Sequence, residues 1–199
     1  MKEKAMQPVA VFYATREGQT QRIAQRVAVA LRASGLEAEI RNLKDDASAM
    51  EQPDRYSAAI LAASVHAGSH EPEMVSFVKR HRAKLDAMPH AFLSVTLSQV
   101  GAEDSTRPAP ERARFAADVE SVIAKFRVET GWHPSWVKPV AGALPYSKYN
   151  FFIRFIMKRI ARKSGAPTDT SRDYDFTNWA ELDTFAQQFA ARLMVRAKG

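Results

Sequence analysis

The fold is decided by one stretch near the start of the chain, Val9-Ala10-Val11-Phe12-Tyr13-Ala14 followed by Thr15-Arg16-Glu17-Gly18-Gln19-Thr20. The first six residues form an apolar run rich in β-branched and aromatic side chains, which is typical of a strand buried on both faces. Apolar residues then recur at helical spacing from Ile23 to Leu31, with polar residues between them. The stretch therefore predicts a strand, a tight turn at Gly18 and a helix whose first amides are capped by Thr20.

A turn of this kind between a strand and a helix offers a site for an anion. Free backbone N–H groups and the positive end of the helix dipole point at the same place. The turn lacks the Gly-Lys-Ser/Thr ending of a nucleoside triphosphate loop, and one glycine is too few for the dinucleotide fingerprint. The hydroxyls of Thr15 and Thr20 suit a singly phosphorylated cofactor that needs no magnesium. An ordinary turn that binds nothing is the alternative.

Composition and charge limit the class of protein. The chain has 199 residues, of which 46% are hydrophobic, so it can build the packed core of one domain. It has no cysteine, which excludes disulfides, thiolate catalysis and cysteine-bound metal centres. The polar N-terminus is not typical of a signal peptide, and no apolar run is long enough to span a bilayer. The net charge of +7 favours an anionic partner: nucleic acid, a membrane surface or an acidic substrate.

Further strand signals alternate with helical ones along the chain. Apolar or alternating runs occur near residues 36–41, 57–63, 91–97 and 136–144, and amphipathic segments separate most of them. This alternation predicts an α/β fold, a doubly wound parallel sheet of five strands in the order 2-1-3-4-5. Pro139 predicts an edge position or a bulge for the fifth strand.

Three loops of this sheet meet at the edge where its strands end. They are Thr15–Thr20, Ser64–His70 and Leu97–Gly101, after the first, third and fourth strands. Two of them consist of small and polar residues, which let backbone amides approach a flat ring. The longer connection of residues 98–110 is rich in proline and serine and is expected to lack regular structure.

An extra segment, about residues 145–177, separates the fifth strand from the last helix. Residues 146–163 predict a basic amphipathic helix that has no acidic residue, and Phe151 and Phe155 lie among its cations. One interpretation is a helix docked on the sheet with a solvated basic face. The alternatives are a helix lying on an anionic membrane surface, or a site for a lipophilic substrate that carries carboxylates. The helix is too apolar for groove binding, which argues against nucleic acid.

The chain resembles the flavodoxin superfamily, and more closely its menaquinone-dependent protoporphyrinogen oxidase branch. The turn Thr-Arg-Glu-Gly-Gln-Thr at residues 15–20 is similar to the Thr-Arg-Asp-Gly-Gln-Thr of that branch. The segment Ala143-Leu144-x-Tyr146 and the basic aromatic helix are similar to the long insertion of that branch, and the likeness continues through Ser164-Gly165-x-x-Thr168-Asp169-Thr170 and Thr177-x-Trp179. The resemblance covers nearly the whole chain as one flavodoxin-like domain, residues 1–199. It departs at His66, where the branch would have arginine.

The resemblance implies a bound FMN and an enzyme that oxidises protoporphyrinogen IX to protoporphyrin IX in heme biosynthesis. Electrons would pass through the flavin to a membrane quinone. The alternative function is that of a flavodoxin-type electron carrier whose basic helix docks an acidic redox partner. The expected location is the cytoplasm, or the inner face of the cell membrane if the inserted helix binds there. A homo-oligomer is left open, and nucleic acid is not an expected partner.

The resemblance also assigns the site residues by position. The residues expected around FMN are Thr15, Arg16, Glu17, Gly18, Gln19, Thr20, Ser64, Val65, His66, Ala67, Gly68, Ser94, Thr96, Leu97 and Ser98. The residues expected at the substrate or the membrane are Tyr146, Phe151, Arg154, Phe155, Lys158 and Arg162. The redox chemistry belongs to the flavin, so no nucleophile is required.

His66 is the one candidate for a catalytic side chain, since an imidazole next to a flavin can donate to a ring oxygen or relay a proton. A loop histidine exposed to solvent is the alternative. His66 and His70 are four residues apart, but no third ligand is clustered with them, so no metal site is predicted.

Overall fold

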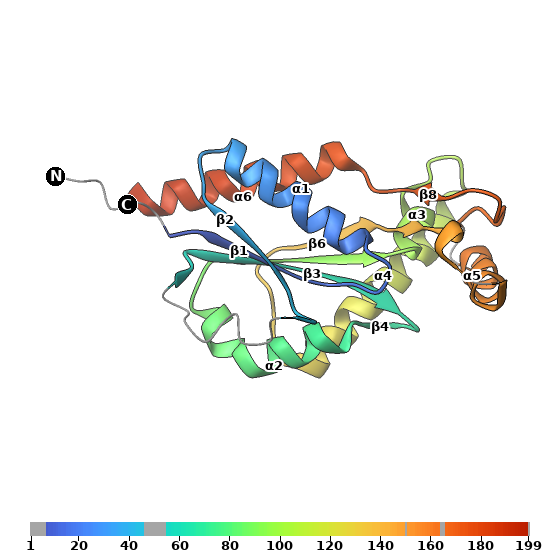
Figure 1. Cartoon of the computed structure of the whole chain (residues 1–199), viewed down its shortest axis with the longest axis horizontal. Coiled ribbons are helices and arrows are strands. Elements are labelled where there is room, and N and C mark those ends of the chain that lie inside the picture. Colours follow the sequence, from blue (N-terminus) through green and yellow to red (C-terminus); the bar gives the residue numbers. More distant parts are fainter. Residues whose placement is uncertain (1–6, 46–54, 150, 164–165, 199) are drawn as a thin grey trace.

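The computed structural model describes residues 7–45, 55–149, 151–163 and 166–198 as an open sheet with helices on both faces (Figure 1). The strands are β1 Val9–Ala14, β2 Ala38–Asn42, β3 Ala58–His66, β4 Ser69–His70, β5 His90–Thr96, β6 Val137–Ala141, β7 Ala143–Leu144 and β8 Tyr174–Asp175. The helices are α1 Gln19–Ala33, α2 Pro72–Asp86, α3 Ser98–Glu103, α4 Ala109–Thr130, α5 Phe151–Lys163 and α6 Trp179–Lys198, with a 3-10 turn, η2, at Tyr146–Lys148.

The main sheet confirms the predicted fold class. Five strands pair in parallel in the order β2-β1-β3-β5-β6, and the short β4 pairs with β3. Both β1 and the first part of β3 are buried along their length, as their unbroken apolar runs predict. The parallel strands all end at the same edge, on the side of the molecule where α3 and α5 lie (Figure 1).

Two apolar layers hold the helices on the sheet. Alternate residues of β1, such as Val9 and Val11, face α1 and α6, while Ala10 and Phe12 face the layer of α2 and α4. Side chains as large as Phe12 are fully buried in these layers. Each contributes about 1.5–3 kcal/mol to the free energy of unfolding. This packing fixes the edge of the sheet from which the loops after β1, β3 and β5 begin.

The loop predicted at residues 64–70 is wrong in its conformation. The strand β3 continues to His66, and the chain turns at Ala67 and Gly68 and returns as β4, antiparallel to β3. The φ angles of Ala67 and Gly68 are 49° and 74°, in the left-handed region that a two-residue hairpin turn requires. The small polar residues of this segment led to the prediction of an irregular loop. Backbone pairing of Val65 with His70 forms a short hairpin instead.

The connection predicted over residues 98–110 is also partly wrong, because it begins with the helix α3. This helix packs closely on α4 at Gly101. A Cβ atom at position 101 would lie 2.4 Å from the ring of Phe115, so only glycine permits the contact. The composition gave no helical period over these six residues, and tertiary packing supplies the stabilisation that the local sequence lacks.

The fifth predicted strand divides in two. Its first part, β6, lies at the edge of the sheet and contains Pro139, which confirms the expected edge position. The chain leaves the ladder at Gly142, whose N–H donates to the Thr96 carbonyl at 3.3 Å while its own carbonyl accepts from Phe176 N at 3.1 Å. The strand β7 then pairs with β8 in a separate two-stranded sheet. The inserted segment is therefore anchored at its two ends by a small antiparallel sheet of its own.

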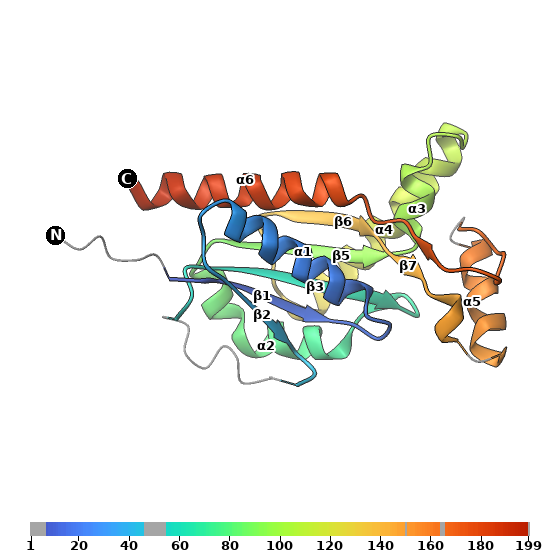
Figure 2. The same cartoon turned by 45° about the horizontal axis from the view of Figure 1, so that its top comes forward.

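The inserted segment has a small core separate from the main one. It is formed by Leu144, Tyr146, Tyr149, Met157, Ala161 and Ala166, against which Leu97, Tyr174 and Phe176 pack. Figure 2 shows η2 and α5 standing beyond the end of the sheet, next to the strand ends and α3. None of the described helices combines the length and the apolar character needed to cross a bilayer.

Candidate functional site

The turn after β1 is shaped to receive an anion. Gly18 takes a left-handed φ of 93° just before α1, and its N–H donates to the Thr15 hydroxyl at 3.1 Å. The prediction that Thr20 caps the helix is wrong, because α1 has no side-chain cap. The Thr20 hydroxyl is fully buried and has no hydrogen-bond partner among the described residues. A buried hydroxyl without a partner is costly, so this position favours a ligand oxygen beside the helix N-terminus.

Arg16 does not face that ligand position. Its guanidinium makes two hydrogen bonds to the Glu73 carboxylate, at 2.8 and 3.0 Å, and its Nε lies 2.8 Å from Glu71. Arg16 is accordingly not among the residues that line the cavity. A cation from the inserted segment also contacts the turn, since Lys148 Nζ donates to the Glu17 carbonyl at 3.5 Å.

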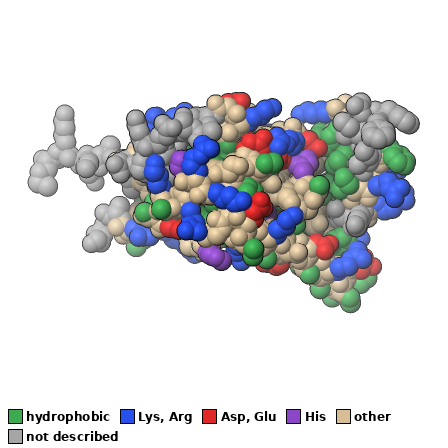
Figure 3. All heavy atoms as spheres, turned by 90° about the horizontal axis from the view of Figure 1, so that it is seen from below, with side chains coloured by type: hydrophobic (Ala, Val, Ile, Leu, Met, Phe, Trp, Pro, Cys, Tyr) green, Lys and Arg blue, Asp and Glu red, His purple; other side chains and the backbone are tan. Residues whose placement is uncertain are grey.

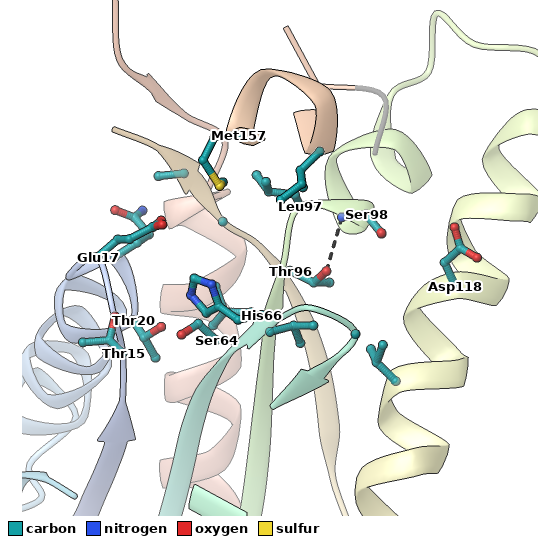
Figure 4. Close-up of a pocket in the computed structure, with 18 of the residues that line it drawn as sticks. Thr15, Glu17, Thr20, Ser64, His66, Thr96, Leu97, Ser98, Asp118 and Met157 are labelled. Atoms are coloured by element: carbon teal, nitrogen blue, oxygen red, sulfur yellow. Dashed lines mark hydrogen bonds between the residues drawn. The ribbon is translucent and has the colours of Figure 1, made fainter. Parts of the chain in front are cut away.

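The other two sides of the site come from the ends of β3 and β5. Figure 4 shows Ser64 and His66 on one side and Thr96, Leu97 and Ser98 on the other, around one hollow. The N–H of Ser98 donates to the Thr96 hydroxyl at 3.3 Å, which holds the start of α3 against the strand end. The main sheet thus brings together three loops that are far apart in the sequence.

These loops enclose a cavity of about 430 Å³, within the usual range of small-molecule sites. The predicted residues that line it are Thr15, Glu17, Gln19, Thr20, Ser64, Val65, His66, Gly68, Thr96, Leu97 and Ser98. The predicted residues that do not line it are Arg16, Gly18, Ala67 and Ser94. Ser94 points instead into the core, where its hydroxyl lies 2.9 Å from His70 Nε2.

The cavity also has lining residues that were not predicted from the sequence. They are Val95, Asp118, Ser121, Val122, Gly142, Ala143, Met157 and Ile160. Asp118, Ser121 and Val122 lie along one face of α4. Their spacing of three and four residues is the sequence feature that indicates a shared face. Met157 and Ile160 come from α5, so the inserted segment forms one wall of the site.

The residues predicted at the substrate or the membrane separate into two groups. Tyr146 is buried and its hydroxyl donates to the Pro167 carbonyl at 3.2 Å, so it belongs to the small core of the insertion. Phe155, Lys158 and Arg162 line a shallow groove on α5 together with Arg159 and Ile160. The side chains of Phe151 and Arg154 lie outside the part that the structure describes. Figure 3 shows apolar and basic side chains gathered at the end of the molecule where α5 lies.

Two groups near the site have shifted pKa values. Burial, aided by the neighbouring Glu17 carboxylate, raises the pKa of Tyr149 above its ordinary value, so this phenol stays protonated next to the turn. Burial lowers the pKa of His70 to about 4. His70 is therefore neutral near pH 7 and packs between the rings of Phe92 and Phe126.

The donors at this edge fit the phosphate and the ring of FMN. The free amides of the first helical turn and the unsatisfied Thr20 hydroxyl suit a phosphate, and small residues leave room for a flat ring beside them. No group of three acidic, histidine or cysteine side chains within the described ranges could hold a metal ion.

A second cavity, of about 510 Å³, lies where the strands begin. Its lining is mainly apolar and includes Trp136, Phe189 and Leu193. It is slightly larger than the cavity at the strand ends, but ligands of open parallel sheets bind at the carboxyl ends of the strands. The cavity beside the turn is therefore the candidate site.

Comparisons with known proteins agree with this geometry. A family model described as a flavodoxin domain matches residues 10–171. The protoporphyrinogen IX dehydrogenase [quinone] of Escherichia coli strain K12 is 32% identical over 182 residues, which cover 90% of this chain and 93% of the relative. The protein of the same name from Leishmania major is 31% identical over 91% of this chain and 74% of its own length.

Solved structures support the fold. A short-chain flavodoxin associated with a bacterial microcompartment aligns with a TM-score of 0.52 at 14% identity, over 96% of this chain and 99% of its own. The Flv1 flavodiiron core from Synechocystis has the same TM-score and identity, over 97% of this chain and 37% of its own. The chain therefore belongs to the flavodoxin domain family, as an FMN-dependent oxidoreductase in the branch that contains the quinone-dependent protoporphyrinogen IX dehydrogenases.

Proposed function

We propose that this protein oxidises protoporphyrinogen IX to protoporphyrin IX and passes the electrons through FMN to a quinone. The observation that carries the proposal is that one cavity is lined both by the turn at Thr20 and by Met157 and Ile160 of the inserted helix. A substrate held against α5 would lie directly beside the flavin site. The relatives that bear the corresponding name are 31–32% identical over about nine tenths of this chain.

The residues of the site divide the work of binding FMN. The turn amides, with the hydroxyls of Thr15 and Thr20, would hold the phosphate, and residues 64–68 and 96–98 would flank the ring. FMN would supply the redox chemistry: protoporphyrinogen loses six electrons and six protons in becoming protoporphyrin, so three two-electron cycles would reduce three quinones to quinols. The chain itself needs only to orient the ring, exclude water and place proton-carrying groups near it.

The inserted helix supplies a surface for the substrate and for the membrane. Phe155 and Ile160 are 56% and 41% exposed, and they stand among Lys158, Arg159 and Arg162 around the shallow groove. Exposed apolar side chains beside cations suit the headgroup region of an anionic bilayer. The same cations can pair with carboxylates of a porphyrinogen. A protein resting on the membrane by this face would meet a quinone dissolved in the bilayer.

The decisive experiment is anaerobic turnover with purified, FMN-loaded protein. We expect protoporphyrin to appear, as measured by its fluorescence, only when both protoporphyrinogen and a quinone are present. Anionic vesicles that carry the quinone should increase the rate. If FMN binds but no porphyrin forms, the proposal is wrong, and transfer of electrons to an acidic redox protein is the function to test next. If the protein stays colourless with excess FMN, the cofactor assignment fails as well.

A further inference from the structure

Glu71, the residue before α2, is a buried carboxylate beside the cavity. Its side chain is 1% exposed. One carboxylate oxygen lies 2.8 Å from Arg16 Nε, and the other accepts a hydrogen bond from the Ser64 hydroxyl at 2.7 Å and lies 3.3 Å from His66 Nε2. The backbone N–H of Glu71 also donates to the Ser64 carbonyl at 3.2 Å.

A buried carboxylate is stable only when its partners replace the water it has lost. The partners of Glu71 come from the two loops on either side of the cavity. Arg16 belongs to the turn after β1, while Ser64 and His66 belong to the end of β3. Glu73, which pairs with the same arginine, is more exposed and touches neither of the β3 residues in the described contacts. Glu71 is thus the side chain that joins the two loops.

The contact with Glu71 also orients His66. A carboxylate oxygen next to Nε2 favours the tautomer with its proton on that nitrogen. The other ring nitrogen, Nδ1, then keeps its lone pair. His66 lines the cavity, and Figure 4 shows its ring between the turn of Thr20 and the strand end at Thr96.

We propose that Glu71 is a positioning residue, which fixes the phosphate turn through Arg16 and the tautomer of His66 through Nε2, so that both parts of the flavin meet one rigid frame. With its proton on Nε2, His66 keeps a lone pair on Nδ1 that can accept a hydrogen bond from a ring N–H group in the cavity that this residue lines. The inference rests on the proposed function for the identity of the ligand, but the frame itself belongs to the protein without any ligand.

The first test is the tautomer of His66, measured by ¹⁵N NMR of the histidine rings at about pH 8, where an ordinary histidine is neutral. The variant His66→Asn identifies the signal. We expect the proton on Nε2 in the native protein and in Glu71→Gln, whose amide oxygen can still accept. In Glu71→Ala the signal should move toward the Nδ1–H form. A native His66 with its proton on Nδ1 would overturn the proposal, whatever the variants do.

The second test is the affinity for FMN, measured by quenching of flavin fluorescence. We expect Glu71→Ala to raise the Kd at least tenfold and Glu71→Gln to raise it less, because the amide keeps the contact with Ser64. Glu73→Gln is the matched control, since it removes a charge from the same arginine and should change the Kd less than threefold. Equal losses in the Glu71→Ala and Glu73→Gln variants would contradict the special role of Glu71. Failure of the native protein to bind FMN would instead contradict the proposed function, and the tautomer measurement would still decide the inference.

Discussion

The turn after β1 and the inserted helix α5 border the same cavity, but they are built in opposite ways. The single cation of the turn, Arg16, pairs with two glutamates outside the cavity, and the turn presents to the cavity backbone N–H groups, hydroxyls and the Glu17 side chain. The helix contains no acidic residue and leaves Phe155 and Ile160 exposed beside its cations. The turn is therefore suited to bind a ligand through backbone N–H groups that point in fixed directions. The helix is suited to bind a ligand through its apolar and basic side chains. We expect changes in the turn to affect the cofactor, and changes in the helix to affect the partner that approaches it.

The largest effect should come from placing a charge in the turn. Thr20→Glu would bring a carboxylate to the position expected for a phosphate, and each pair of like charges at about 4 Å costs about 4 kcal/mol. We expect the Kd for FMN to rise at least about 1,000-fold, which corresponds to about 4 kcal/mol. The near-isosteric Thr20→Val removes only the hydroxyl and should cost about 1 kcal/mol, or about fivefold. Fluorescence titration measures both.

The control for this prediction is Thr184→Glu. Thr184 is an exposed threonine of α6 whose hydroxyl donates to the Ala180 carbonyl. The variant should bind FMN as the native protein does, and circular dichroism should show that all three variants keep their fold. If Thr20→Glu binds FMN as tightly as the native protein, the turn is not part of the cofactor site, and the contrast between turn and helix fails.

A second effect concerns His70 of β4, whose burial makes the free energy of unfolding depend on pH. The pKa of His70 is about 4 in the folded protein, below its ordinary value of 6.5, so the unfolded chain binds more protons between these values. The stabilising effect is complete above pH 6.5 and is lost as the pH falls toward 4. At about 1.4 kcal/mol per pH unit over about 2.5 units, the loss is at most about 3.5 kcal/mol.

Urea unfolding at about pH 7 and about pH 4.5 measures this loss, and His70→Gln should reduce it by about 2 kcal/mol. Carboxylates with lowered pKa values, such as Glu73 beside Arg16, also destabilise the fold in acid, but they do so equally in both proteins. An equal pH dependence in native and variant proteins would show that His70 is not the buried group responsible.

The third effect belongs to the helix and should leave the turn untouched. Lys158→Glu with Arg162→Glu reverses two charges at the shallow groove, and each basic residue near an anionic surface contributes about 1 kcal/mol. Loss of the two cations alone would weaken binding to anionic vesicles about 30-fold, and the new negative charges add repulsion, so we expect a loss of at least about 30-fold with an unchanged Kd for FMN. The control, Lys79→Glu with Arg80→Glu, changes the same charge on the exposed face of α2. If the control weakens vesicle binding equally, net charge and not the helix binds the membrane.

The two regions also differ in how far the sequence predicted them. The order of the sheet could be predicted from apolar runs and from the rules for parallel connections, and both are local patterns. The directions of single side chains could not. Arg16 was predicted at the cofactor, but its partners Glu71 and Glu73 are more than fifty residues away. Asp118 of α4 lines the cavity, and α4 packs on α3 at Gly101 through Phe115, a contact that no period in the sequence indicates.

The smallest effect tests one of the links between the two regions, the side chain of Gln19. Its side-chain amide donates to Asp175 of β8 at 2.9 Å and to the Thr177 hydroxyl at 2.8 Å, at the two-stranded sheet that anchors the insertion. Gln19→Leu removes both hydrogen bonds and the one that Gln19 Oε1 accepts from Arg22; all are partly or fully exposed, and together they contribute about 1 kcal/mol. We expect the Kd for FMN to rise about threefold and hydrogen exchange in β8 to become faster.

The matched control for the link is Gln187→Leu, on the exposed face of α6, which should change neither quantity. A threefold change in affinity alone, with exchange in β8 unaltered, would mean that Gln19 acts only within the turn. Faster exchange alone would mean that the insertion depends on the turn but the cofactor does not depend on the insertion. Only the two changes together would show that the Gln19 amide couples the inserted segment to the turn after β1, beyond what the contacts of Lys148 with Glu17 and of Arg22 with Asp175 already do.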